Sequence, residues 1–153
     1  MIKNNGNVKL AVKPLLCKAG QKFREQLDKA YPERDKRSDG WIADARHMAR
    51  RKSDHCPTPE GWVFALDVDR GLAGQSNKPD LMPDLANQIR LAAKRDKRFK
   101  YIIFDKKIAS AKTLWRWLPY RGNNAHSHHM HISFSTQGQD DDSPFQIPML
   151  GGN

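Results

Sequence analysis

The sequence predicts an α+β protein with a small central antiparallel sheet flanked by helices. Two segments carry apolar residues at helical spacing, and two others alternate between apolar and polar residues. In addition, the apolar run YIIF at 101–104 is followed at once by KKIAS at 106–110, which reads as the second strand of a hairpin. With 153 residues, the chain has room for one domain with a single modest core.

Two amphipathic helices are predicted. Apolar residues recur at helical spacing from Leu16 and stop at Pro32, which predicts a helix over 15–31. A second helix is predicted over 81–95, with Asp80 as its N-cap. The residues that this second helix is expected to bury are Leu81, Leu85, Ile89 and Ala92.

Two strands each present polar side chains on a single face. Residues 61–69 (GWVFALDVD) place Asp67 and Asp69 on one side of an extended chain. Residues 129–134 alternate in the same way, so that Met130, Ile132 and Phe134 go to the core. The side chains on the opposite face are His129, His131 and Ser133.

The remaining segments are predicted to be irregular. The stretch 32–60 is dense in charge, proline, serine, aspartate and glycine, which predicts a long surface connection with a short helix around 42–51. The two ends, 1–13 and 136–153, are expected to be extended or mobile, the second as a possible wrapping segment. Residues 1–153 are expected to form one domain.

Membrane and export signals are absent from the pattern of the sequence. No run approaches the ~20 apolar residues that span a bilayer. The stretch Val8–Leu16 is interrupted by two lysines and a proline, so it does not read as a secretory signal. The two cysteines, Cys17 and Cys56, lack CxxC spacing and cannot build a disulfide framework.

The charge balance points to anionic partners. The chain has 27 Lys and Arg against 17 Asp and Glu, a formal net charge of +10. Such a surface attracts nucleic acid, anionic lipid headgroups or anionic wall polymers. Charge by itself does not choose among them.

A cluster of histidines points to a metal site. Four of the six histidines fall within residues 126–131. A catalytic zinc ion takes three ligands from His, Asp or Glu and keeps a fourth position open. Two strands laid side by side can project Asp67 and His131 into the same cleft, with His55 arriving from the preceding loop. The sequence therefore predicts Zn²⁺ held by His55, Asp67 and His131.

These residues resemble a known signature. Ser53-x-His55, Ala65-x-Asp67 and His129-x-His131 are similar to the motifs of the LAS zinc metallopeptidases, which include D-alanyl-D-alanine carboxypeptidases and dipeptidases, murein endopeptidases, phage endolysins and the hedgehog signalling domain. The stretches SDGWIADARHMARRKSDHCP and WRWLPYRGNNAHSHHMHIS look like a phage and prophage branch of this group, over roughly residues 20–135. The resemblance implies a hedgehog or D-Ala-D-Ala-peptidase-like fold for a single catalytic domain.

The resemblance also implies roles for individual residues. His55, Asp67 and His131 would bind zinc, His129 would lie beside the zinc-bound water, and His126 would support it. Many relatives carry a Glu or Asp as general base three residues before the third ligand, a position held here by His128. Murein endopeptidases use a histidine-rich motif ending in His-x-His instead, which this sequence matches better.

Relatives also stabilise the transition state with an arginine upstream of the first ligand. The arginines in that region are Arg46, Arg50 and Arg51, of which Arg51 is our candidate. A solvent-facing basic helix is an equal reading of the same three residues.

The implied function is hydrolysis of peptide bonds in bacterial peptidoglycan, with a zinc-bound water attacking the scissile carbonyl. The substrate would be the stem peptide, cut at L-Ala-D-Glu or at a D-Ala-containing cross-link. We expect a monomer that is made in the cytoplasm of a host bacterium without a signal peptide and acts, after release, on an anionic envelope in the periplasm or cell wall.

Two alternatives stay open. The first is a basic nucleic-acid-binding phage protein, in which Trp115 and Trp117 stack on bases. We do not expect nucleic acid as the partner, because this reading leaves the histidine cluster without a role. The second is a LAS-like domain that keeps zinc but has lost catalysis, in line with the missing carboxylate at His128. Trp115, Trp117 and Tyr120 could otherwise line a substrate groove or anchor a loop.

Overall fold

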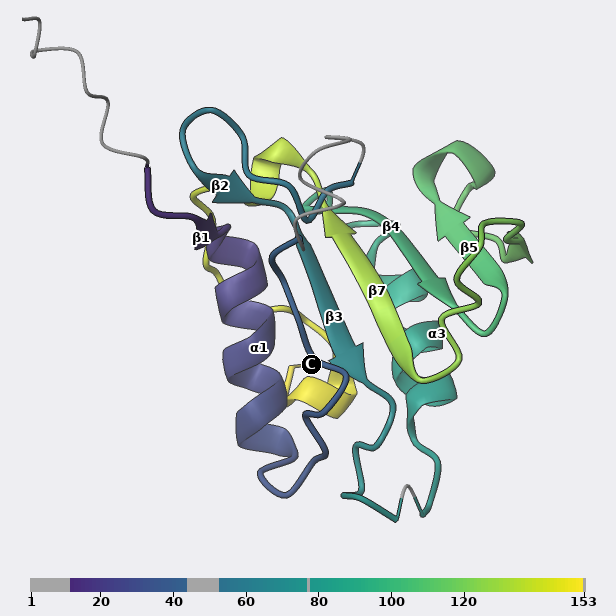
Figure 1. The fold of residues 1–153 in the computed structure, drawn as a ribbon. Coiled ribbons are helices and arrows are strands. Elements are labelled where there is room, and N and C mark those ends of the chain that lie inside the picture. Colours follow the sequence, from purple (N-terminus) through teal and green to yellow (C-terminus); the bar gives the residue numbers. More distant parts are fainter. Residues whose placement is uncertain (1–11, 44–52, 77, 153) are drawn as a thin grey trace, which may run out of the picture.

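A five-stranded antiparallel sheet organises the chain (Figure 1). The computed structural model describes residues 12–43, 53–76 and 78–152. The strand order is β3-β7-β4-β5-β6. The bounds of these strands are β3 Ala65–Asp69, β4 Phe99–Phe104, β5 Lys107–Ser110, β6 Leu118–Pro119 and β7 His129–Phe134.

Two α-helices lie within the described residues, α1 (Lys18–Ala30) and α3 (Met82–Ala92). A separate parallel pair joins β1 (Leu15–Leu16) to β2 (Trp62–Val63). Short 3-10 turns complete the list, η2 Ala111–Thr113, η3 Thr136–Gly138 and η4 Pro148–Leu150. No helix in the described part of the chain is long and apolar enough to cross a bilayer.

The sheet has one apolar and one polar face. Alternate residues of β3, β4 and β7 join one core cluster with the buried side chains of α1 and α3, while the residues between them face the other way. Figure 1 shows α3 behind the sheet and α1 beside it, and no helix among the described residues covers the opposite face. The prediction of an α+β protein with an antiparallel sheet is confirmed, with both helices on the same face.

The two alternating segments form strands as predicted. In β7, Met130, Ile132 and Phe134 are all buried in the core cluster. The other segment, 61–69, is interrupted at Phe64 and divides into β2 and β3. Its first half pairs with β1 rather than with the main sheet, and this parallel pair was not predicted.

The hairpin prediction is confirmed. Strands β4 and β5 pair from Phe104 opposite Lys107, which leaves only Asp105 and Lys106 in the turn. Both turn residues have positive φ, 49° and 62°, as in a type I′ turn. This tight turn matches the twist of the strands and fixes their register.

The first helix starts later than predicted. Leu15 and Leu16 fit helical spacing, but they pair with β2, and α1 begins at Lys18. The side chain of Gln21 donates a hydrogen bond of 2.6 Å to the Leu16 carbonyl at this junction. The helix ends at Ala30, two residues before Pro32, as the sequence predicts.

The second helix also begins without its predicted cap. Its N-cap is Leu81, and no side chain caps it. The Asp80 prediction is wrong because this carboxylate pairs with Arg70, at 2.6 Å, instead of turning back to the helix. Within the helix, Leu85 and Ile89 are fully buried, whereas Leu81 and Ala92 pack only partly against the core.

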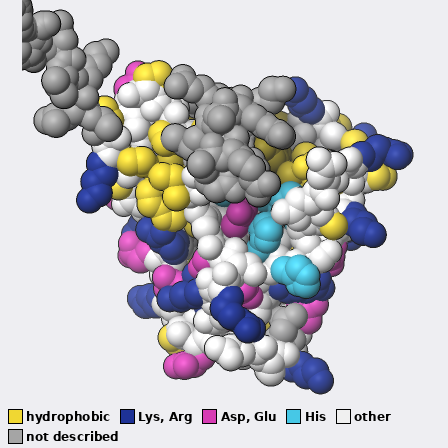
Figure 2. Space-filling view, in the orientation of Figure 1, with side chains coloured by type: hydrophobic (Ala, Val, Ile, Leu, Met, Phe, Trp, Pro, Cys, Tyr) yellow, Lys and Arg dark blue, Asp and Glu magenta, His cyan; other side chains and the backbone are white. Residues whose placement is uncertain are grey.

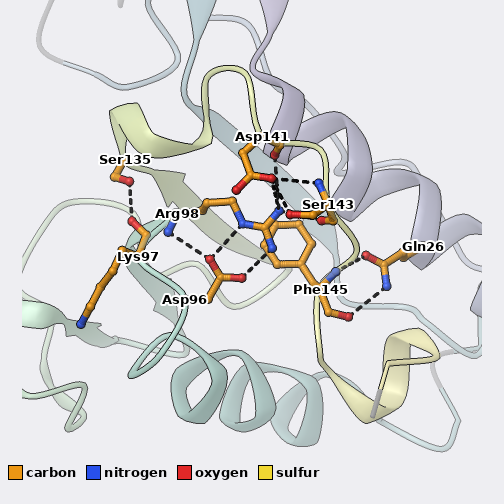
Figure 3. A network of polar contacts seen from close by, with 8 residues as sticks. All are labelled: Gln26, Asp96, Lys97, Arg98, Ser135, Asp141, Ser143 and Phe145. Atoms are coloured by element: carbon orange, nitrogen blue, oxygen red, sulfur yellow. Dashed lines mark hydrogen bonds and ion pairs between the residues drawn. The ribbon is translucent and has the colours of Figure 1, made fainter.

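The segment after β7 wraps across the core. Phe145 and Ile147 are fully buried, and the turn η4 contacts both α1 and α3. Gln26 of α1 brackets Phe145, accepting from its backbone N–H at 2.8 Å and donating to its carbonyl at 3.2 Å (Figure 3). The predicted extended or mobile end at 136–153 is therefore, over its described part, a packed wrapping segment.

Arg98 fastens this segment from the sheet side. Its guanidinium donates to the carboxylate of Asp96 at 2.6 Å and to the carbonyl of Ser143 at 2.6 Å. The same guanidinium lies 3.9 Å from the centre of the Phe145 ring, as Figure 3 shows. One buried cation thus joins the start of β4 to the wrapping segment.

Several predicted features lie outside the described residues. They include most of the N-terminal end 1–13, of which only residues 12 and 13 are described, and most of the short helix around 42–51. Arg51 and the neighbouring arginines Arg46 and Arg50 lie there as well.

Removing the Phe145 ring should destabilise the protein strongly. Phe145→Ala is expected to lower the free energy of unfolding by about 3–5 kcal/mol, since the ring is fully buried against the rings of Phe23 and Phe99. The matched control is Asp142→Ala in the same segment, an exposed residue whose loss should change stability by less than about 0.5 kcal/mol. Denaturant unfolding measures both, and equal effects would contradict the core role of Phe145.

Candidate metal centre

The register of β3 and β7 brings two predicted ligands together. Asp67 lies directly opposite His131, and Asp69 lies opposite His129. Directly opposite residues of an antiparallel pair point to the same face, with their Cβ atoms about 5 Å apart. The polar face of the sheet therefore carries Asp67 and His131 side by side.

A neighbouring segment delivers the third predicted ligand. Gly40 forms a two-way backbone bridge with Asp67, with hydrogen bonds of 2.7 and 3.2 Å, and so continues the sheet beyond β3. The next carbonyl, that of Trp41, accepts a hydrogen bond of 2.9 Å from Nδ1 of His55. The Ser53 hydroxyl accepts from the His55 backbone N–H at 3.1 Å. These contacts aim Nε2 of His55 at the strand pair.

The three ligand atoms form a nearly regular triangle. Oδ1 of Asp67 lies 3.1 Å from Nδ1 of His131 and 3.3 Å from Nε2 of His55, and the two nitrogens are 3.2 Å apart. Ligand atoms bound to a tetrahedral zinc at about 2.0–2.1 Å lie roughly 3.3–3.4 Å from one another. The triangle thus has the size of three corners of a zinc tetrahedron, and these three residues form a group that could hold a metal ion.

The outer nitrogen of each imidazole is also engaged. Nδ1 of His55 donates to the Trp41 carbonyl, and Nε2 of His131 lies 2.7 Å from the Ser133 hydroxyl. If a metal ion were bound, the proton of each neutral imidazole would lie on this outer nitrogen, and the inner nitrogen would offer its lone pair to the ion. Such outer contacts fix the tautomer and orientation of histidines that bind metals.

Tyr101 supports His131 from β4. Its ring stacks on the imidazole with centroids 5.4 Å apart and planes inclined by 17°. Its hydroxyl interacts with Ser133, the partner of His131, because Tyr101 lies opposite Ser133 in the strand register. Burial raises the pKa of Tyr101 to about 12, so the hydroxyl stays protonated at neutral pH.

Charge is balanced within the triangle itself. Burial by itself would raise the pKa of Asp67, but hydrogen bonds from His131 and His55 outweigh it and hold this pKa well below its usual range. Burial likewise opposes protonation of His55, yet the Asp67 carboxylate raises the pKa of His55 above its ordinary value. Asp67 is therefore ionised at neutral pH and would supply the negative charge to a bound cation.

The site opens to one side of the molecule. The side chains of Asp67 and His55 keep 21% and 15% of their exposure, while that of His131 keeps 7%. Figure 2 shows carboxylate and histidine side chains meeting near the middle of this face. The triangle is therefore partly exposed to solvent, chiefly at Asp67 and His55.

The other predicted histidines take different positions. Nε2 of His129 lies 3.7 Å from Oδ2 of Asp67, at the rim of the triangle. The buried His126 packs edge-on against His129, with ring centroids 5.0 Å apart, and its Nδ1 donates to the Asn124 carbonyl at 2.7 Å. His128 is exposed and lines a separate cavity of about 410 Å³ beside the site, together with Asp69 and Arg70.

Both rim histidines are neutral at pH 7. Burial and, to a smaller extent, the nearby His131 together lower the pKa of His126 to about 4. Burial also lowers the pKa of His129, against the opposing pull of Asp67. A neutral imidazole can accept a proton, which His129 is placed to do next to the Asp67 carboxylate.

Several site residues escaped the sequence analysis. The Trp41 carbonyl is a backbone group and leaves no trace in side-chain patterns. Tyr101 was visible only as part of an apolar run, although Ser133 was already placed on the histidine face. Trp115, by contrast, is buried in the core cluster and does not line the site. Asp69 accepts backbone hydrogen bonds from Ser38 and Gly71 and so has a structural role.

The chain is expected to bind one zinc ion. His131→Ala should weaken zinc binding by at least about 100-fold, because even the loss of an outer partner of a ligand costs 10–100-fold. His128→Ala is the matched control from the same cluster and should leave the affinity unchanged, since His128 points into the neighbouring cavity. Isothermal titration of chelator-treated protein measures both, and equal losses would refute the assigned ligand set.

The lowered pKa of His126 predicts a stability change with pH. Below about pH 6.5 the unfolded chain protonates His126, whereas the folded chain does so only near pH 4. The free energy of unfolding of the metal-free protein should therefore fall as the pH drops through this window, by roughly 2–3 kcal/mol from this group.

Comparison with His126→Asn isolates this contribution. Asparagine tolerates the positive φ of 56° at this position. His55 contributes with the opposite sign, because its pKa is raised, but it is present in both proteins and cancels. Denaturant titrations at both ends of the window should give a shallower pH slope for the variant, and identical slopes would disprove the prediction.

Comparisons with protein-family models, with curated proteins and with solved structures found no significant match to the chain.

Proposed function

We propose that the chain is a zinc-dependent peptidase that hydrolyses peptide bonds of bacterial peptidoglycan. The observation that carries this proposal is the triangle of Asp67, His55 and His131, whose ligand atoms are 3.1–3.3 Å apart and whose side chains are partly exposed to solvent. Three protein ligands with an open position are typical of catalytic zinc, whereas structural zinc sites are closed by four. The resemblance of the surrounding motifs to LAS peptidases supplies the substrate class and a hedgehog-like fold.

The donor set favours zinc over harder cations. Two imidazole nitrogens and one carboxylate suit zinc, while calcium and magnesium are bound by oxygen ligands. The outer contacts of both imidazoles, to the Trp41 carbonyl and the Ser133 hydroxyl, are of the kind that hold zinc ligands in place.

The chemistry divides between the metal and the rim histidines. When bound, zinc polarises a substrate carbonyl and lowers the pKa of water from ~15.7 toward ~7. His129, neutral and 3.7 Å from Asp67, accepts the proton of the attacking water and passes it to the leaving amine. The packing of His126 against His129 orients this ring. Arg51 remains the candidate that stabilises the transition state.

The substrate is the stem peptide, cut at L-Ala-D-Glu or at a D-Ala-containing cross-link. The formal net charge of +10 favours contact with the anionic bacterial envelope. In this proposal the protein is a monomer that reaches the periplasm or wall after release from the cytoplasm.

One observation favours a second candidate, a zinc-binding domain without catalysis. The position at which many relatives carry the basic carboxylate is occupied by His128, which is exposed and turned into the neighbouring cavity. The nucleic-acid alternative has less support, because Trp115, one of its two stacking residues, is only 4% exposed.

Lysis assays on purified peptidoglycan test the proposal. The wild-type protein should cleave it, a chelator should abolish cleavage, and added zinc should restore it. His129→Ala should keep its zinc but lose activity by about 10²–10⁴-fold, the usual share of a general base. His128→Ala, the control, should remain near wild type.

The outcomes separate the candidates. A zinc-loaded wild-type protein that cleaves no peptidoglycan would favour the non-catalytic domain. A zinc-loaded His129→Ala protein with near-normal turnover would remove the role of His129 but leave the peptidase. Mass spectrometry of the released muropeptides identifies the bond.

A further inference from the structure

A protruding arm joins the sheet to the loop 123–128 before β7, which we call the histidine loop. We define the β5–β6 arm as residues 105–122, which comprise β5, η2, β6 and their turns; Figure 1 shows it at the right-hand edge of the molecule. It exposes two large apolar side chains, Leu114 at 71% and Leu118 at 44%. Leu114 is the most exposed large apolar side chain in the described part of the chain.

The exposure of Leu114 is built into the backbone. Leu114 and Trp115 both have positive φ, 55° and 60°, which is uncommon for bulky residues. Trp115 is buried in the core cluster, and its carbonyl accepts a hydrogen bond of 2.9 Å from Arg90. The reversal at these two residues thus anchors one side chain inside and holds the other in solvent.

Cations surround the exposed leucines. The arm carries five of them, Lys106, Lys107, Lys112, Arg116 and Arg121, and a single acid, Asp105, which is already paired with Arg70 at 2.9 Å. None of the five cations forms an ion pair with another described residue. Figure 2 shows dark blue and yellow side chains together along the same edge.

We propose that the β5–β6 arm is a docking surface for an anionic lipid bilayer. Its leucines would enter the boundary between headgroups and acyl chains, while its cations would meet lipid phosphates. Charge complementarity identifies the anionic partner, and the two leucines favour a bilayer over a soluble polyanion. Stacking on a nucleic acid has less support, because Trp115 is buried and Trp117 is partly buried, with Nζ of Lys107 5.6 Å from the centre of its ring.

Docking would place the candidate metal centre next to the bilayer. Two backbone hydrogen bonds tie the base of the arm to the histidine loop, from the N–H of Lys106 to the Ala125 carbonyl at 2.9 Å and from the N–H of Asp105 to the His126 carbonyl at 3.1 Å. The Tyr120 ring also packs edge-on against His126. The inference goes beyond the proposed function, because docking requires no metal and no catalysis.

Vesicle co-sedimentation of the full chain tests the apolar contribution. Metal-free protein should bind vesicles of equal parts phosphatidylglycerol and phosphatidylcholine and not vesicles of phosphatidylcholine alone. The double variant Leu114→Asn and Leu118→Thr should bind at least about tenfold more weakly, since each leucine loses its apolar burial. Asparagine suits the left-handed backbone and threonine suits a strand, so the arm keeps its fold. The control is Leu91→Gln, a residue of α3 that is 47% exposed.

A second pair of variants tests the charge contribution. Neutralising Lys112, Arg116 and Arg121 to glutamine should weaken binding by about fivefold for each charge. The matched control neutralises Lys94, Arg95 and Lys97, which lie in sequence between α3 and β4 and change the net charge equally. Near-UV circular dichroism confirms that each variant is folded.

Three results would overturn the inference. They are equal loss of binding from the two triple variants, equal loss from the arm and α3 leucine variants, and binding to single-stranded DNA that depends on the arm cations but not on its leucines. The last result would identify a soluble polyanion as the partner. Zinc binding and peptidoglycan cleavage are measured without vesicles, so failure of either experiment leaves the other interpretable.

Discussion

The opposition of Asp67 and His131 across β3 and β7 is the constraint on which the rest of the site depends. It is set by the core rather than by the ligands, because Leu66 and Val68 on one strand and Met130 and Ile132 on the other must all face the helices. A slip of one residue in either strand would bury its charged or imidazole side chains and expose its apolar ones. The pattern that folds the sheet is thus also the pattern that assembles the candidate ligands.

Buried polar groups need hydrogen-bond partners, and residues 34–41 supply several of them near the site. Arg34, only 6% exposed, pairs with Asp28 and Asp39, and Asp39 accepts a hydrogen bond from the Asp69 backbone. This holds Gly40 against Asp67, and with it the carbonyl that orients His55. Buried polar groups are stable only when such networks are complete. The frame of the site therefore extends well beyond the three residues that would bind a metal.

Much of this arrangement was predictable, for identifiable reasons. Strict alternation predicted β7 and the face shared by His129 and His131, and it also predicted that Asp67 lies on a strand. What alternation cannot reveal is which backbone carbonyl a side chain meets, so the role of Trp41 required coordinates. Helical spacing also does not show whether a residue pairs with a strand instead. Leu16 fits the helical spacing but pairs with β2. The wrapping segment was read as extended or mobile because aspartates and prolines outnumber the few residues, such as Phe145, that enter the core.

The wrapping segment has a consequence for the order of events in synthesis. Each strand of the sheet precedes it in the chain, so on a ribosome the sheet emerges before Phe145, Ile147 and Leu150 can cover it. Until these residues are synthesised, part of the apolar face of the nascent sheet stays exposed to solvent. Folding is thus expected to be completed only after the wrapping segment has been synthesised. During that delay, chaperones that recognise exposed apolar strands are expected to bind the growing chain.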